Sequence, residues 1–141
     1  MTDVIRLLTR AQKLLRAAAD EAMSAHGVRI GQNLVLEVLW DRDGLSPGEL
    51  AAKLQVSTPT VVNTATRMVK DGLIERRADP ADGRLVRLYL TAKGSGAREP
   101  IEAARRLLAE RALATLGDEE REVLAGALQK IIDQMQGPAS G

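Results

Sequence analysis

The stretch that decides the fold of this 141-residue chain is residues 45–94, LSPGELAAKLQVSTPTVVNTATRMVKDGLIERRADPADGRLVRLYLTAKG. A helix is expected to begin after Ser46, because Pro47 suits the first helical position and Glu49 completes a capping box with that serine. Apolar residues follow at helical spacing, and the helix is expected to end near Gln55. The stretch therefore opens with one short, well-marked helix.

A second short helix is predicted after Ser57, a residue type that favours the N-cap position. Three apolar residues at helical spacing give this helix one face for the core: Val61, Ala65 and Met68. The opposite face is short, polar and partly basic, and consists of Pro59, Asn63, Thr66, Arg67 and Lys70. Two short helices joined by a tight turn predict a helix-turn-helix.

A hairpin is predicted after Gly72, which is typical of a helix C-terminus. Residues 73–77 form its first expected strand, residues 78–84 a turn-rich loop, and residues 85–90 the returning strand. Helix, turn, helix and hairpin together predict a winged helix, in which the hairpin is the wing.

The predicted hairpin is basic and has two different faces. In its second strand Val86, Leu88 and Leu90 alternate with Arg87 and Tyr89, so one face is expected to pack and the other to face solvent. Its four arginines are Arg76, Arg77, Arg84 and Arg87. An arginine at a loop tip suits a narrow DNA minor groove, because the negative potential there attracts a guanidinium.

The outward face of the second helix carries residue types that suit a DNA major groove. Asparagine contacts base edges, threonine offers a hydroxyl and a methyl group, and arginine or lysine binds phosphate or guanine. Asparagine and threonine are poor helix formers, so their concentration in one helix needs a reason. A solvated polar face without a partner stays open as the alternative.

Charge is distributed unevenly along the chain. The whole sequence has a net charge of +1. Residues 53–94 hold eight basic and four acidic residues, a net charge of +4, whereas residues 1–52 and 95–141 have net charges of −1 and −2. A basic segment between mildly acidic flanks is the pattern expected when only the middle of the chain meets an anionic partner.

Composition excludes several kinds of chemistry. The chain has no cysteine and one histidine, His26, so disulfides, thiolate catalysis and Cys- or His-rich metal sites are excluded. Trp40 and Tyr89 are the only aromatic residues, which argues against proteins that stack single-stranded bases on aromatic platforms. No catalytic residue, metal site or cofactor is predicted, and an enzyme is the least supported class.

The flanks of the deciding stretch are predicted to be helical. Three apolar faces mark the helices: Val4, Leu7, Leu8, Ala11, Leu14, Leu15, Ala18 and Ala22; then Ile101, Ala104, Leu108, Ala112 and Leu116; then Leu124, Leu128, Ile131 and Met135. Pro100 is expected to kink or restart the second helix, and Asp118 marks the start of the third. These helices are too long and too apolar to serve residues 32–94 alone. A two-fold dimer interface is expected, with a monomeric bundle as the alternative.

No targeting signal is apparent at the N-terminus, where charged residues interrupt the apolar ones, and no membrane span is expected. A soluble, cytoplasmic protein without a membrane partner is therefore expected.

Residues 30–94 resemble the MarR family (multiple antibiotic resistance regulators) of bacterial, homodimeric winged-helix transcription factors. Three motifs carry the resemblance: LSPGELAAKLQVSTPTVV, RMVKDGLIERR and, most specifically, DPADGRLVRLYLTAKG. The resemblance implies a mainly α fold with a small β-hairpin wing and with N- and C-terminal dimerisation helices. It implies one domain over residues 1–141, with a winged helix-turn-helix at 30–94 and dimerisation regions at 1–26 and 95–137. Gln55 departs from the family, which often has glycine there, and is expected to adopt an unfavourable backbone angle.

The resemblance also implies roles for individual residues. The helix from Ser57 to Lys70 would be the recognition helix. Its expected DNA contacts are Thr58, Pro59, Thr60, Val62, Asn63 and Arg67. Arg84 would enter the minor groove from the wing, held by Asp82, and Arg76, Arg77 and Arg87 are further candidate contacts on the hairpin. Ser46 and Ser57 would cap helices and touch phosphate through the helix N-termini.

Regulation by a small organic ligand is a further expectation from the resemblance, since ligands of the family often bind between the dimer helices and the DNA-binding lobe. The candidate lining residues are His26, Arg29, Gln32, Asn33 and Trp40, although packing in the core is the stronger interpretation for Trp40, and a helix end for His26. The preferred hypothesis is a homodimeric repressor that binds a pseudo-palindromic site in double-stranded DNA. A winged-helix module for protein contact is the alternative.

Overall fold

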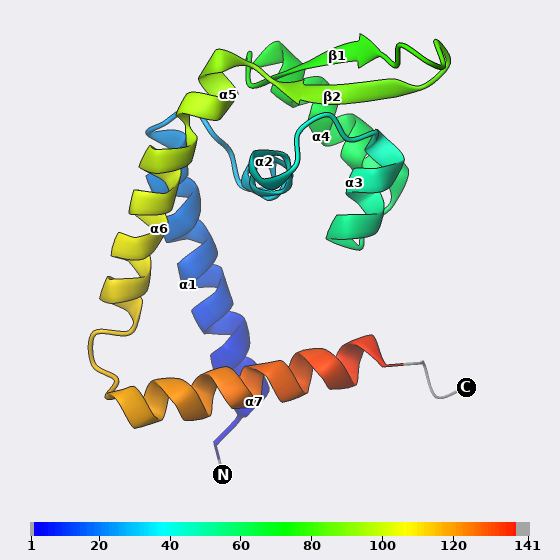
Figure 1. The fold of residues 1–141 in the computed structure, drawn as a ribbon. Helices are drawn as coiled ribbons and strands as arrows, with labels where there is room; N and C mark the ends of the chain where they lie inside the picture. The colour runs from blue at the N-terminus through cyan, green and yellow to red at the C-terminus, as the bar shows by residue number, and fades with distance from the viewer. Residues whose placement is uncertain (1, 138–141) are drawn as a thin grey trace. The chain divides into compact units, whose positions relative to one another are not determined.

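The computed structural model describes residues 2–137 and is mostly helical, with a two-stranded antiparallel hairpin (Figure 1). Its elements in chain order are α1 (Val4–Ser24), α2 (Gln32–Asp41), α3 (Pro47–Leu54), α4 (Thr58–Lys70), β1 (Ile74–Ala78), β2 (Val86–Leu90), α5 (Ala92–Gly96), α6 (Arg98–Ala112) and α7 (Asp118–Gln136). The chain divides into two compact units, residues 1–108 and residues 109–141. The predicted fold class, mainly α with a hairpin wing, is confirmed.

Helices α3 and α4 begin where the caps predict. The Ser46 hydroxyl accepts a hydrogen bond from the backbone N–H of Glu49, and the Glu49 carboxylate accepts one from the backbone N–H of Ser46. Ser57 caps α4 by accepting from the N–H of Thr60. Gln55 ends α3 in the left-handed region, with φ 56°, as the sequence predicts. These caps satisfy backbone donors that an uncapped helix would leave without partners.

The core of the first unit lies around α2, which Figure 1 shows end-on with α3, α4 and the hairpin about it. Its largest fully buried side chains include Leu36 and Leu39 of α2, Leu50 of α3, Met68 of α4, and Leu88 of β2. Burying one such side chain stabilises a fold by about 1.5–3 kcal/mol relative to leaving it in water. The predicted core face of α4 is confirmed, since Val61, Ala65 and Met68 are each no more than 1% exposed.

The hairpin pairs Ile74 with Leu90 at its base and Ala78 with Val86 at its outer end. Alternation correctly places Leu88 in the core, but Val86 is 38% exposed although it lies on the same face. The expected packed face is therefore wrong at Val86. The reason is that the hairpin extends past the helices that it packs on, as Figure 1 shows, so its outer end has no core beneath it.

The helix expected from about Thr91 is interrupted. Thr91 caps the short helix α5, and α6 then begins at Arg98 with Pro100 in its first turn. A proline is tolerated there because the first-turn N–H groups have no partner inside the helix. The predicted restart is confirmed, whereas Leu116, expected in this helix, lies beyond its end at Ala112.

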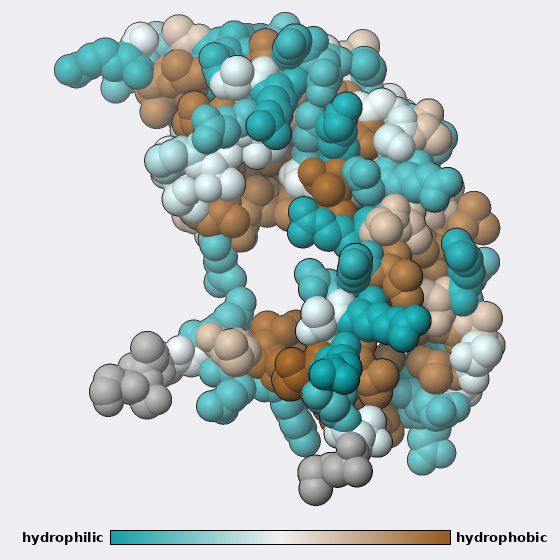
Figure 2. All heavy atoms as spheres, turned by 180° about the vertical axis from the view of Figure 1, so that it is seen from behind, coloured by the Kyte–Doolittle hydropathy of each residue, from teal (hydrophilic) through white to brown (hydrophobic). Residues whose placement is uncertain are grey.

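The terminal helices leave large apolar side chains exposed. On α1 these are Val4, Ile5, Leu7, Leu14 and Leu15, each at least 44% exposed. On α7, which begins at Asp118 as predicted, they are Val123, Leu124, Leu128, Ile131, Ile132 and Met135, and no residue of this helix is buried. Figure 2 shows such apolar side chains (brown) at the surface. Among residues 2–137, no helix combines the length and the apolar character that crossing a membrane requires.

Candidate DNA-binding surface

The outward face of α4 is exposed to solvent. All six of its predicted contact residues are exposed: Thr58, Pro59, Thr60, Val62, Asn63 and Arg67. The face is held rigidly, because Val61, Ala65 and Met68 anchor the opposite side of the same helix in the core. A rigid helix with an exposed polar face suits the major groove of B-DNA, which is about 12 Å wide and admits an α-helix.

Two of the threonine hydroxyls on this helix already have partners. Thr60 Oγ1 lies 2.7 Å from the hydroxyl of Ser57, within the N-cap. Thr66 donates to the carbonyl of Val62 and accepts a 2.7 Å hydrogen bond from Arg76 of the hairpin. Arg76, a predicted DNA contact, therefore also ties the wing to the recognition helix, which the sequence pattern did not indicate.

The tip of the wing presents one nearly free guanidinium. The side chain of Arg84 is 97% exposed, and its Nε lies 3.7 Å from Oδ1 of Asp82. The same Asp82 oxygen accepts the backbone N–H of Arg84. Asp82 thus shapes the turn that carries Arg84, in agreement with the predicted pairing, and leaves its guanidinium accessible from solvent.

Arg77 lies on the face of the hairpin opposite to that of its neighbour Arg76. Its guanidinium binds the carboxylate of Glu75 and sits 4.4 Å from the centre of the Tyr89 ring. A cation over an aromatic face is stabilised by about 0.5–1 kcal/mol at exposed sites. Arg77 keeps an exposed side chain, so it can still meet an anionic partner.

Arg87 occupies a different position from the other wing arginines. Its Nε donates to Oδ2 of Asp79 at 2.6 Å, and its Nη1 donates to the carbonyl of Gly44 at 2.9 Å and to Oε1 of Glu49 at 3.2 Å. The side chains of Arg87 and Asp79 are only 28% and 11% exposed. We call Arg87, Asp79 and Glu49 the wing clamp. The expected solvent-facing position of Arg87 is corrected, because carboxylates from the loop and from α3 enclose it.

The hydrogen bonds of the wing clamp lower the pKa values of its two carboxylates. The hydrogen bond from Arg87 lowers the pKa of Asp79 most, and the backbone N–H of Ala81 lowers it further. Hydrogen bonds from Ser46, helped by the charge of Arg87, lower the pKa of Glu49. Because these interactions favour the charged carboxylates, the clamp is fully ionised at neutral pH.

The stabilisation by the Asp79–Arg87 pair is expected to disappear in acid. Since the pKa of Asp79 is lower in the folded chain, the stabilisation is present above the unfolded-state pKa and is lost as the pH falls through the folded-state pKa. The difference in unfolding free energy between wild type and Asp79→Asn should stay constant from about pH 8 to pH 5 and shrink below about pH 4. Urea denaturation across this range measures it, and a difference that persists undiminished at about pH 3 would contradict the assignment.

The two capping serines differ in accessibility. Ser57 is exposed at the start of α4, and the N-terminus of a helix is a favourable place for a phosphate. Ser46 is only 7% exposed, and its hydroxyl is engaged in the capping box. The structure therefore gives Ser46 a capping role and leaves it little accessible surface for the predicted phosphate contact.

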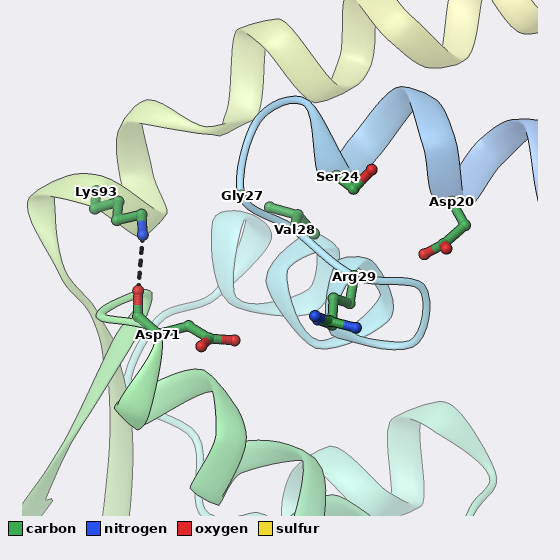
Figure 3. A pocket seen from close by; sticks show the side chains of 7 residues that line it. All are labelled: Asp20, Ser24, Gly27, Val28, Arg29, Asp71 and Lys93. Carbon is green, nitrogen blue, oxygen red and sulfur yellow. Dashed lines mark hydrogen bonds between the residues drawn. The ribbon is translucent and has the colours of Figure 1, made fainter.

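A cavity of about 500 Å³ lies where the end of α1 meets the helix-turn-helix. Its lining residues are Asp20, Ser24, Gly27, Val28, Arg29, Asp71 and Lys93. Figure 3 shows Lys93 donating to the backbone carbonyl of Asp71, on the opposite side of the opening from Asp20 in this view. The lining is polar and carries both signs of charge.

Of the five residues predicted to line an effector pocket, the cavity includes only Arg29. Gln32 is buried and bonded to the carboxylate of Asp71, and Asn33 accepts the backbone N–H of Gly31 near the start of α2. Trp40 packs against the core and donates to the carbonyl of Gly94, while His26 is exposed after α1. The acidic and lysine members of the lining were missed, because the loop conformation that brings them together has no local sequence signal.

Comparison with known proteins agrees with this geometry. The model of the MarR family matches residues 29–86, which contain α2, the helix-turn-helix and most of the hairpin. A helix-turn-helix-type transcriptional repressor of Mycobacterium bovis is 32% identical over 126 residues, which are 89% of this chain and 90% of the relative.

Two solved structures share the fold. MepR of S. aureus, in a complex with DNA, superposes with a TM-score of 0.84 at 24% identity, covering 95% of this chain and 99% of MepR. A mutant of MarR from E. coli, in a complex with operator DNA, gives 0.80 at 24% identity, with 89% and 91% covered. The family match, the repressor relative and the shared fold lead to one conclusion: the chain belongs to the MarR family of winged helix-turn-helix transcriptional regulators.

Proposed function

We propose that the protein is a homodimeric repressor that binds a pseudo-palindromic site in double-stranded DNA in the cytoplasm and is released by a small organic ligand. The observation that carries the DNA-binding part is the pairing of two exposed elements: the outward face of α4, held by its buried opposite face, and the free guanidinium of Arg84 at the wing tip. The first suits a major groove and the second a minor groove. The name of the M. bovis relative supports repression.

The apolar faces of α1 and α7 support the dimer. Leu128 and Ile131 of α7 are 37% and 41% exposed in the single chain, and Leu14 of α1 is 62% exposed. Large exposed apolar faces of this kind mark interaction sites. A two-fold dimer would cover these faces and present two copies of α4, as a site with two half-sites requires.

Leu128→Glu is expected to convert the dimer to a monomer, because each copy places a charge at the centre of the apolar face of α7. Sedimentation velocity should show twice the mass of one chain for wild type and a single chain for the variant. Lys130→Glu, on the same helix but away from this face, is the matched control and should stay dimeric. A monomeric wild type would contradict the proposal.

The cavity beside Arg29 supports the proposal that a small organic ligand regulates the protein. A molecule bound there would touch both the terminal helix α1 and Asp71, the residue that caps the C-terminus of the recognition helix. The basic side chains of Arg29 and Lys93 suit an organic acid. A thermal-shift screen of aromatic acids tests this part. A ligand that stabilises wild type but not Arg29→Ala, and that releases DNA, is expected; a ligand with equal effect on both proteins would place the site elsewhere.

The second candidate function is a winged-helix module for protein contact. Salt dependence separates the two functions, because contacts to several phosphates release counterions and make the affinity fall steeply with salt. Fluorescence anisotropy with the gene's own upstream duplex, from about 50 to 200 mM salt, should show a loss of about 10³-fold or more if each dimer makes six or more phosphate contacts. Absent binding at low salt would remove DNA as the partner.

A further inference from the structure

The wing clamp links the start of α3 to the wing tip through consecutive hydrogen bonds. Glu49 of the α3 capping box accepts from Arg87, and Arg87 donates to Oδ2 of Asp79. The other oxygen of Asp79 accepts the backbone N–H groups of Ala81 and Asp82, at 2.7 and 3.1 Å. Each residue of the clamp therefore constrains the next one toward the tip.

The last step of this series reaches Arg84. Oδ1 of Asp82 accepts the backbone N–H of Arg84 at 3.1 Å, and the N–H of Leu85 donates back to the carbonyl of Asp82. The N–H of Asp79 donates to the carbonyl of Leu85 and closes the loop. The conformation of the tip is thus set by Asp79 and Asp82, and the orientation of Asp79 is set by Arg87.

Other support for the outer part of the wing is weak. Val86, opposite Ala78 at the outer end of the ladder, is 38% exposed, and the neighbouring Leu85 is 36% exposed. A two-stranded hairpin without a hydrophobic face is marginally stable in water. Two sets of polar side chains join the wing to the helix-turn-helix: Arg76 of β1, which donates to Thr66 of α4, and the clamp, which alone reaches the loop at the tip through Asp79.

We propose that Arg87 is a positioning residue that fixes the wing tip, and with it Arg84, relative to α3 and α4, and that it does not contact DNA itself. Its side chain is 28% exposed, and its guanidinium already donates to two carboxylates and one carbonyl, so it has little left to offer a phosphate. The expected effect of Arg87 on DNA affinity rests on the proposed function. Its role in ordering the wing tip is independent of that function.

The ordering can be measured without DNA. The chain has no cysteine, and a side chain added at Gly83 meets no atom within 4 Å, so a spin label on Gly83→Cys reports the motion of the tip. Arg87→Ala and Asp79→Asn should each increase the mobility of the label. Glu75→Gln, which removes a wing carboxylate outside the clamp, is the matched control and should leave the mobility unchanged. Unchanged mobility in Arg87→Ala, with the fold intact by circular dichroism, would overturn the proposal.

Binding measurements on the dimer separate positioning from contact. Asp79→Asn removes a negative charge near DNA and should nevertheless weaken binding about tenfold, because the tip is released. Arg87→Lys keeps the charge but cannot reproduce the forked hydrogen bonds, so it should resemble Arg87→Ala. In an Arg84→Ala background, Arg87→Ala should change Kd by less than about twofold.

The opposite results identify a direct contact. Additive effects of Arg84→Ala and Arg87→Ala, full retention of affinity in Arg87→Lys, and tighter binding by Asp79→Asn would show that Arg87 binds DNA itself. If wild type binds no DNA while the label mobility responds as expected, the proposed function fails and the ordering role of the clamp stands.

Discussion

Gly94→Ala is expected to lower the free energy of unfolding by about 3 kcal/mol or more, the range of severe overpacking. A Cβ atom at this position would lie 2.1 Å from the backbone carbonyl oxygen of Leu73. That oxygen belongs to main chain and already accepts the N–H of Thr91, so it cannot move aside cheaply. The carbonyl of Gly94 also accepts the indole N–H of Trp40, so a displaced α5 would lose this bond too.

Gly96→Ala is the matched control for this prediction. Gly96 lies at the end of the same helix, and an added Cβ meets no atom within 4 Å there. Alanine is a better helix former than glycine by about 1 kcal/mol inside a helix, so this variant should be as stable as wild type or more so. Urea denaturation measures both variants. Equal stability of Gly94→Ala and wild type would show that α5 does not pack on Leu73 as described.

Asn63→Ala is expected to weaken specific DNA binding by about 1–3 kcal/mol for each half-site, or about 2–6 kcal/mol for a dimer. Asn63 is exposed at the middle of the outward face of α4, and an asparagine amide can form two hydrogen bonds with adenine. The loss of affinity should be seen with the preferred DNA sequence and not with unrelated duplexes. Preference at one symmetric pair of base positions should disappear, while binding to unrelated duplex changes little.

Lys70→Ala provides the contrast. A lysine at the end of α4 can bind phosphate but carries little base discrimination, so the substitution should weaken binding to all duplexes alike and reduce the salt slope by about one for each copy. Anisotropy titrations with the preferred and the mutated duplex distinguish the two patterns. If Asn63→Ala weakened binding uniformly as well, Asn63 would have no role in base recognition.

Local signals predicted the parts of the fold that depend on a few neighbouring residues. The caps at Ser46 and Ser57, the end of α3 at Gln55 and the restart near Pro100 all follow from backbone preferences within one or two turns. The recognition face of α4 was predictable for the same reason, because helical periodicity places Val61 in the core and Asn63 opposite it.

Contacts across a long sequence separation could not be predicted in this way. Alternation in β2 places Arg87 toward solvent, but Glu49 lies 38 residues earlier and Gly44 lies 43 residues earlier, and both enclose it. The cavity beside Arg29 likewise joins α1 to Lys93, which lies far along the chain. Val86 is exposed because the hairpin extends past the helices beneath it. How far a hairpin extends over its neighbours depends on tertiary packing and has no local sequence signal.

The most direct test of the central claim is selection of duplexes from a random library by the full-length protein at physiological salt. A homodimer that binds through α4 and the wing should enrich a pseudo-palindrome with half-sites about one helical turn, or roughly 10 base pairs, apart. Asn63→Ala should lose preference at one symmetric position of that motif. A library without an enriched motif, or one that retains a single half-site, would contradict sequence-specific binding by a two-fold dimer.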